Sequence, residues 1–197
     1  MALFINTLAA LIVLAGVPLT STRSLAAGTD HDLESILSTL AQRKHAHVEF
    51  DEQITSSLLK NPLRASGELF FDAPDRLEKR TSKPAPEDLV VEADVVTIVR
   101  GRRRNTMRLS EYPPLRPLLE GIRAVLAGDL PTLQKTFQIT VDRADNSWTL
   151  TLRPSPAQAA PLYELIRIRG GAGIVRSVMM QRTNGDRTEM FLTEPAE

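Results

Sequence analysis

Two histidines stand at a spacing that metal chemistry can use. His45 and His47 lie two residues apart, so on a strand both side chains would point to the same side and could share a metal ion. The chain contains no cysteine and no histidine-rich cluster that would complete a set of ligands. We therefore interpret the pair as exposed residues at a turn from helix to strand, and we predict no metal site.

Catalytic groups are also hard to assemble from the sequence. No serine stands in a Gly-x-Ser-x-Gly turn, and cysteine nucleophiles are absent. Asp51 and Glu52 are adjacent and would face opposite ways on a strand, whereas paired catalytic carboxylates must converge on a substrate. We interpret both as ordinary surface charge.

The glycine-rich segment Gly170–Gly173 follows a predicted strand, as a phosphate-binding loop would. No amphipathic helix comes after it, so there is no helix N-terminus to hold a phosphate. Together with the missing catalytic groups, this indicates a protein that is not an enzyme and that holds no cofactor.

Charge argues against nucleic acid as a partner. Lys and Arg number 24 and Asp and Glu number 24, so no overall field attracts a polyanion. One basic run, Arg100-Gly101-Arg102-Arg103-Arg104, has no interleaved aromatic residues that would stack on bases. We expect this run to be the solvated tip of a hairpin. Contact with anionic lipid head groups or with a partner protein is the alternative.

The elements that must position any site are mostly short strands. Alternating hydrophobic residues bounded by turn signals predict strands at Val48–Leu58, Ser66–Asp72, Arg76–Thr81, Asp88–Ala93, Val95–Arg100, Asn105–Leu109, Phe137–Arg143, Ser147–Arg153, Leu162–Arg169, Ile174–Gln181 and Asp186–Leu192. Short turns such as Ala144-Asp145-Asn146 join neighbouring strands, which indicates an antiparallel meander. Ile166 and Ile168 alternate with Arg167 and Arg169, so we expect one face of the sheet to be dry and the other wet.

Two segments have helical spacing instead. Thr29–Gln42 carries one apolar stripe, and a second stripe in the middle of the chain is formed by Leu115, Leu118, Leu119, Ile122, Val125 and Leu126. Gly128 suits the C-terminal cap of this central helix, and Pro131 is expected to prevent its continuation. The dry face of the sheet is the obvious partner for the central stripe.

The first residues have the features of a signal peptide. An uncharged apolar run from Leu3 to Leu19 leads into Ser24-Leu25-Ala26-Ala27, whose small residues suit cleavage after Ala26. We expect residues 1–26 to be removed and residues 27–197 to form one soluble domain in the periplasm, where a chain without cysteines is not unusual. The rival interpretation is an uncleaved anchor, which needs about 20 apolar residues and is interrupted here by Asn6, Gly16 and Pro18.

Several segments taken in order carry a family likeness. Ser66–Thr81 (SGELFFDAPDRLEKRT) has a Gly, an alternating strand, a Pro and a bulky residue three places later, at Gly67, Leu69, Phe71, Pro74 and Leu77. Phe50-Asp51-Glu52 precedes it, Trp148–Pro154 (WTLTLRP) follows it, and Gly185–Phe191 closes the chain. This ordered set resembles the LolA family of periplasmic lipoprotein carriers and related lipid carriers.

The resemblance implies a fold and a site. The fold would be mainly β with helices: an unclosed antiparallel barrel of about 11 strands with a helical lid. Leu69, Phe71 and Leu77 would line a lipid-binding cavity, and the lid helix would present Leu118, Leu119, Ile122 and Val125. The protein would be a monomer that shields the acyl chains of lipoproteins or related lipids between an inner-membrane donor and an outer-membrane acceptor protein.

Two positions depart from the family pattern. Ala73 stands where the lipoprotein carriers have an arginine that helps to hold the lid, so we expect apolar contact alone to hold it here. Leu77 and Lys79 replace an aromatic pair on the second strand of the motif. The cargo is therefore expected to be either a lipoprotein or another acyl-bearing product such as a glycolipid. A protein that kept the fold and lost the cavity is the alternative, although an aromatic content of 5% favours a hollow.

Overall fold

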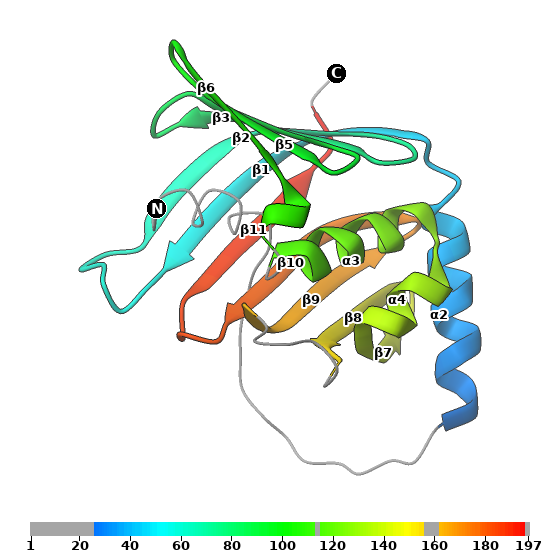
Figure 1. Ribbon diagram of the computed structural model, residues 1–197. Helices are drawn as coiled ribbons and strands as arrows, with labels where there is room; N and C mark the ends of the chain where they lie inside the picture. The colour runs from blue at the N-terminus through cyan, green and yellow to red at the C-terminus, as the bar shows by residue number, and fades with distance from the viewer. Residues whose placement is uncertain (1–25, 113–114, 156–161, 196–197) are drawn as a thin grey trace.

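The computed structural model describes residues 26–112, 115–155 and 162–195, and one strongly curved antiparallel sheet dominates it (Figure 1). The sheet has 11 strands in the order β6-β5-β4-β3-β2-β1-β11-β10-β9-β8-β7. Each pair of neighbours is antiparallel, and β6 and β7 are its two unpaired edges, so the sheet does not close into a barrel. The predicted fold, an unclosed antiparallel barrel with helices, is confirmed.

Eleven strands lie close to the predicted segments. They are β1 (His45–Thr55), β2 (Leu63–Asp72), β3 (Arg76–Lys83), β4 (Glu87–Glu92), β5 (Val95–Arg100), β6 (Arg103–Arg108), β7 (Phe137–Ala144), β8 (Ser147–Pro154), β9 (Tyr163–Gly171), β10 (Ile174–Arg182) and β11 (Arg187–Thr193). The basic run forms the tip of the β5–β6 hairpin, where Gly101 has a φ of 56° and Arg102 to Arg104 are exposed.

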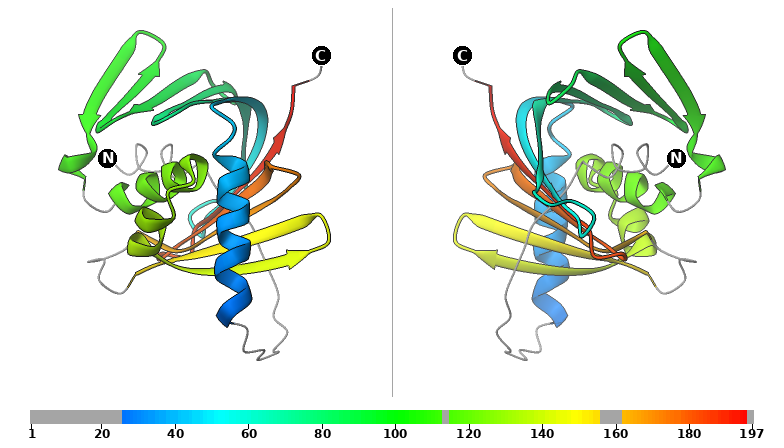
Figure 2. Two further views of the ribbon diagram at one scale, coloured as in Figure 1. Left: turned by 90° about the vertical axis from the view of Figure 1, so that its right-hand side faces the viewer. Right: turned by 90° about the vertical axis from the view of Figure 1, so that its left-hand side faces the viewer.

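The pairing of β1 with β11 joins the two halves of the chain. It places Glu52 opposite Met190 and Phe50 opposite Leu192, while β2 lies on the other side of β1. Figure 2 shows both ends of the sheet bending toward the same side, so that helices α3 and α4 lie within the concavity.

The two faces of the sheet differ as the alternation of residues predicts. On β9, Ile166 and Ile168 are buried, whereas Arg169 on the opposite face is exposed and Arg167 is half-buried. Side chains two residues apart on a strand point to the same face, so a period of two produces one dry face.

Within the described residues, three α-helices cover the dry face and one end of the sheet. They are α2 (Ala26–Leu40), α3 (Arg116–Ala127) and α4 (Leu130–Thr136), and a short 3-10 turn (Leu109–Glu111) precedes α3. Gly128 ends α3 with a φ of 72°, a left-handed conformation that glycine adopts without a steric penalty. None of the helices in the described parts of the chain combines the length and the apolar character that crossing a membrane requires.

Helix α3 ends at Ala127 with Gly128 as its cap, as expected, but a further helix that was not predicted, α4, begins at Leu130. Asp129 accepts a hydrogen bond from the backbone N–H of Thr132, and Pro131 stands in the first turn of the new helix α4. A proline is tolerated there because the first N–H groups of a helix have no intrahelical partner. Pro131 therefore lies in the start of a second helix rather than only stopping the first.

The predicted signal peptide, residues 1–26, lies outside the described residues except for Ala26.

Candidate functional site: an apolar hollow between the sheet and helix α3

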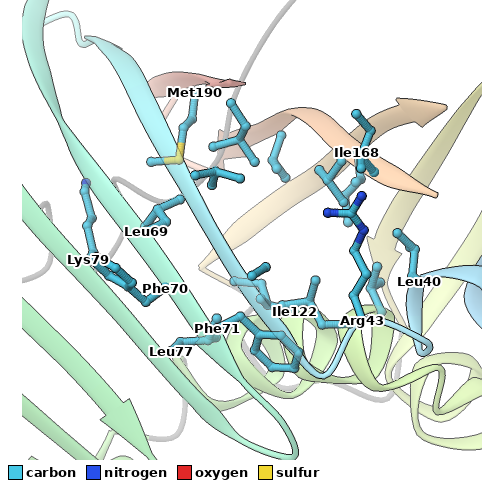
Figure 3. Close-up of a pocket in the computed structure, with 18 of the residues that line it drawn as sticks. Leu40, Arg43, Leu69, Phe70, Phe71, Leu77, Lys79, Ile122, Ile168 and Met190 are labelled. Atoms are coloured by element: carbon cyan, nitrogen blue, oxygen red, sulfur yellow. The ribbon is translucent and has the colours of Figure 1, made fainter. Parts of the chain in front are cut away.

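A cavity of about 460 Å³ lies between the concave face of the sheet and α3 (Figure 3). Strands β1 to β4 form one wall, β9 to β11 form another, and α2 and α3 contribute side chains at its end and roof. The volume falls within the range of about 300–1,000 Å³ that is typical of small-molecule sites. Most of the lining is apolar, which suits hydrocarbon.

The three predicted cavity residues all line this hollow. Leu69 and Phe71 are two residues apart on β2, and Leu77 pairs with Phe71 across the β2–β3 ladder, so the strand register brings the three together. Phe70 between them also borders the hollow, while its ring stacks on the ring of His47 at 4.4 Å between centroids.

The two histidines lie on the convex face of the sheet. His45 Nδ1 is 2.8 Å from Asp72 Oδ1 and His47 Nε2 is 2.9 Å from Glu68 Oε1. Each ring therefore contacts a carboxylate of the neighbouring strand β2 at the surface, away from the hollow.

The apolar side chains of the predicted lid helix α3 fall into two groups: some line the hollow, and others pack into the core. Leu119, Ile122 and Val125 line the hollow, whereas Leu118 is buried in the core without bordering the hollow. A Cβ on Gly121 would lie 2.4 Å from the ring of Phe137 on β7, so the helix backbone lies directly on that ring. One side of α3 is therefore packed tightly and only the other side faces the hollow.

Charge also acts on α3, so the expectation that apolar contact alone holds it was incomplete. Burial lowers the pKa of Arg123, and the carboxylates of Asp75 and Asp94 oppose that shift. These acids stand in the β2–β3 and β4–β5 turns, so they attract the helix toward both turns. Within the described residues, Nε and Nη2 of Arg123 are buried without a hydrogen-bond partner.

An ion pair stands beside the α2 end of the hollow. Arg43 Nη1 lies 3.2 Å from Glu194 Oε1, and both residues belong to the lining. Figure 3 shows Arg43 beside Leu40 at this end. The two residues are 151 positions apart in the chain, so no local pattern in the sequence predicts the pair.

A second ion pair is fully buried in the wall, and it corrects the interpretation of Glu52 as surface charge. Lys79 Nζ donates to Glu52 Oε2 at 2.8 Å, with Lys79 2% and Glu52 4% exposed. Glu52 follows Phe50 by two residues on β1 and Lys79 follows Leu77 by two residues on β3, so strand alternation turns both toward the concave face. Asp51 is exposed, as expected.

Comparison with known proteins decides the family. Residues 25–197 match the family described as outer membrane lipoprotein carrier protein LolA-like. The chain belongs to the LolA-like family. No curated protein matches the sequence at a significant level.

Solved structures similar to this LolA-like chain are distant in sequence. A LolA superfamily protein from Nitrosomonas europaea is 8% identical with a TM-score of 0.46, covering 84% of this chain and 92% of that one. The Mycobacterium tuberculosis lipoprotein LppX is 10% identical with a TM-score of 0.45, covering 86% and 99%. A putative outer membrane lipoprotein-sorting protein domain from Vibrio parahaemolyticus is 8% identical with a TM-score of 0.43, covering 82% and 90%.

Proposed function

We propose that this LolA-like protein is a periplasmic carrier that shields acyl chains of lipoproteins or related lipids in transit from the inner to the outer membrane. The observation that carries the proposal is the apolar hollow of about 460 Å³ beneath α3. Each methylene group moved from water into such a hollow gains about 0.8 kcal/mol, so an acyl chain is held without any catalytic group.

The partners follow from this role. An inner-membrane protein would donate the cargo and an outer-membrane protein would accept it, with the carrier acting as a monomer after removal of residues 1–26. The alternative of an interaction protein without a cavity fits the hollow poorly. A cargo other than lipoprotein, such as a glycolipid or another acyl product, is the second candidate, because Lys79 places a cation in the wall.

Binding of a fluorescent acyl chain tests the proposal. Leu77→Glu puts a carboxylate where hydrocarbon would lie, and burying an unpaired charge costs several kcal/mol, so binding should fall at least about tenfold. Val90→Glu is the matched control, because Val90 alternates with Leu89 and Val91 of the lining and faces the convex side.

The control should bind like the unchanged protein. Circular dichroism of both variants reports whether the sheet survives. We expect both to fold, because a hollow tolerates a polar side chain better than a filled core does. Unfolding of Leu77→Glu alone would identify Leu77 as ordinary core. Equal binding by a folded Leu77→Glu protein would place the acyl chain elsewhere.

A further inference from the structure

The Glu52–Lys79 pair is a charged feature in the wall of an apolar site. Lys79 lines the hollow and pairs across the β2–β3 ladder with Leu69, which lines it too. Its ammonium also lies 4.8 Å from the centroid of the Phe50 ring. Figure 3 shows Lys79 on the wall formed by β2 and β3, near Leu69 and Phe70. A ligand that fills the hollow therefore passes next to this cation.

Glu52 is a buried carboxylate with a hydrogen bond to only one of its two oxygens. Its Oε2 accepts from Lys79, but its Oε1 is buried and has no hydrogen-bond partner among the described residues. Burial raises the pKa of Glu52 to about 7, even though Lys79 pulls the pKa down. A carboxylate in this state takes up a proton at neutral pH at little cost in free energy.

The other charges around Glu52 act in the same direction. Glu87 on β4 is the second acidic group near Glu52 and raises its pKa further, while Glu87 itself is paired with Arg100 on β5. The residues opposite Glu52 on its two neighbouring strands, Ala65 on β2 and Met190 on β11, carry no charge. Lys79 is thus the cation that stabilises the charged form of Glu52.

We propose that Lys79 is the recognition point for an acyl compound with a single negative charge, and that Glu52 takes up one proton when the anion binds. This inference rests on the carrier function proposed above. The Nζ–H···Oε2 hydrogen bond breaks, Nζ–H donates to an anionic oxygen of the cargo, and the proton from solvent goes to the Glu52 carboxylate. A carboxylate of a fatty acid and a phosphodiester head group both carry one charge.

Charge balance favours one negative charge rather than two. Before binding, the site holds one ammonium and one carboxylate; after binding, it holds one ammonium, one anion and a neutral carboxylic acid. The buried net charge is therefore unchanged, and an unpaired buried charge, which is costly, never forms. A dianionic group would leave one negative charge uncompensated in the wall.

Calorimetry with matched short-chain probes tests this inference on the mature protein. Decanoate and a ten-carbon lysophosphatidylglycerol carry one negative charge, and decanol carries none. We expect the tighter-binding of the two charged probes to bind at least about tenfold more tightly than decanol at pH 7. Titrations at pH 8 in buffers of different ionisation enthalpy should show uptake of nearly one proton per bound anion. Anion affinity should weaken above about pH 7 by up to tenfold per pH unit, whereas decanol affinity should stay constant.

Variants separate this mechanism from proton uptake by the probe itself. Glu52→Gln should bind the anion without taking up a proton and without dependence on pH. Lys79→Met should bind decanoate no better than decanol and keep its affinity for decanol. The double variant Glu52→Gln/Lys79→Met serves if Lys79→Met alone does not fold.

The outcomes distinguish the two proposals. Equal affinity for charged and uncharged probes, or proton uptake that persists in Glu52→Gln, overturns the role of the Glu52–Lys79 pair and leaves the carrier function standing. Failure of all three probes to bind overturns the carrier function itself. The choice between decanoate and the lysophospholipid identifies which anionic group the site takes.

Discussion

The concave face of the sheet is filled at one end and hollow at the other. At the filled end, where α4 packs on the sheet, Leu133 of α4 and Leu150 of β8 are 0% exposed and Leu152 of β8 is 1% exposed. Where β1 to β4 and β9 to β11 face α3, the same alternation of residues leaves the hollow, and Leu69 there is only partly buried. Both regions come from strands with one dry face, so the strand pattern alone does not decide which becomes a core. The helices that pack on the sheet decide it.

The largest expected difference between the two regions is in stability. Leu150→Ala should lower the free energy of unfolding by about 2–5 kcal/mol, because it opens a cavity in a filled core. Leu69→Ala should cost clearly less, since this side chain already borders empty space and loses fewer contacts. Urea unfolding of both variants measures the difference, and equal losses would mean that the hollow is packed like the core.

The buried Glu52–Lys79 pair gives the wall of the hollow a dependence on pH near neutrality. The folded pKa of Glu52, about 7, lies above its ordinary value of 4.5, so the folded chain binds this proton more tightly than the unfolded chain does. The free energy of unfolding should therefore fall as pH rises from about 4.5 to 7, by up to about 1.4 kcal/mol per pH unit from this group.

Glu52→Gln is the control for this slope. It keeps the shape of the side chain and removes its titration, so its stability curve should lack the contribution of Glu52 over the same window. A slope that persists unchanged in Glu52→Gln would assign the pH dependence to other groups.

A smaller effect is expected on the packed side of α3. Gly121→Ala places a methyl group about where the Phe137 ring lies, 2.4 Å from its nearest atom, and overpacking of this kind costs about 1–3 kcal/mol. Acyl-chain affinity should change little, because Gly121 does not line the hollow. Thermal unfolding measures the loss of stability, and the fluorescent binding assay measures the affinity for the acyl chain. A loss of affinity without loss of stability would show that this side of α3 also serves the site.

The smallest expected change is in the motion of α3. Amides in Pro117–Leu126 should exchange faster than those of the sheet in lipid-free protein and slow down when lipid is added, because cargo replaces contacts that the helix makes across the hollow. Equal protection of these amides from exchange with and without lipid would show that α3 is a fixed part of the core. The contact of Gly121 with the Phe137 ring already fixes one side of the helix in this way.

Local patterns predicted most of the fold. The bounds of Val95–Arg100 agree with β5, and the other strands differ from their predicted segments by a few residues, because alternation and turn residues act over short distances. Helix α4 was missed because Pro131 was interpreted only as a stop for the central helix, whereas Asp129 caps a new helix that has Pro131 in its first turn.

The candidate site was predicted only in its apolar part. Leu69, Phe71 and Leu77 were found through the β2–β3 motif, which is local. Glu52 and Lys79 lie 27 positions apart on strands separated by β2, so their pairing depends on the registers of both the β1–β2 and the β2–β3 ladders. The signal that could have identified them is the alternation of residues, since each stands two residues from a buried apolar side chain on its own strand.

Native mass spectrometry of the protein purified from the cells that produce it tests most directly whether the hollow is a cargo site. The account predicts a population heavier than the bare mature chain by the mass of an acyl compound, carried equally by Val90→Glu and absent from folded Leu77→Glu. A folded unchanged protein that is always bare, or a Leu77→Glu protein that carries the same compound, would contradict it.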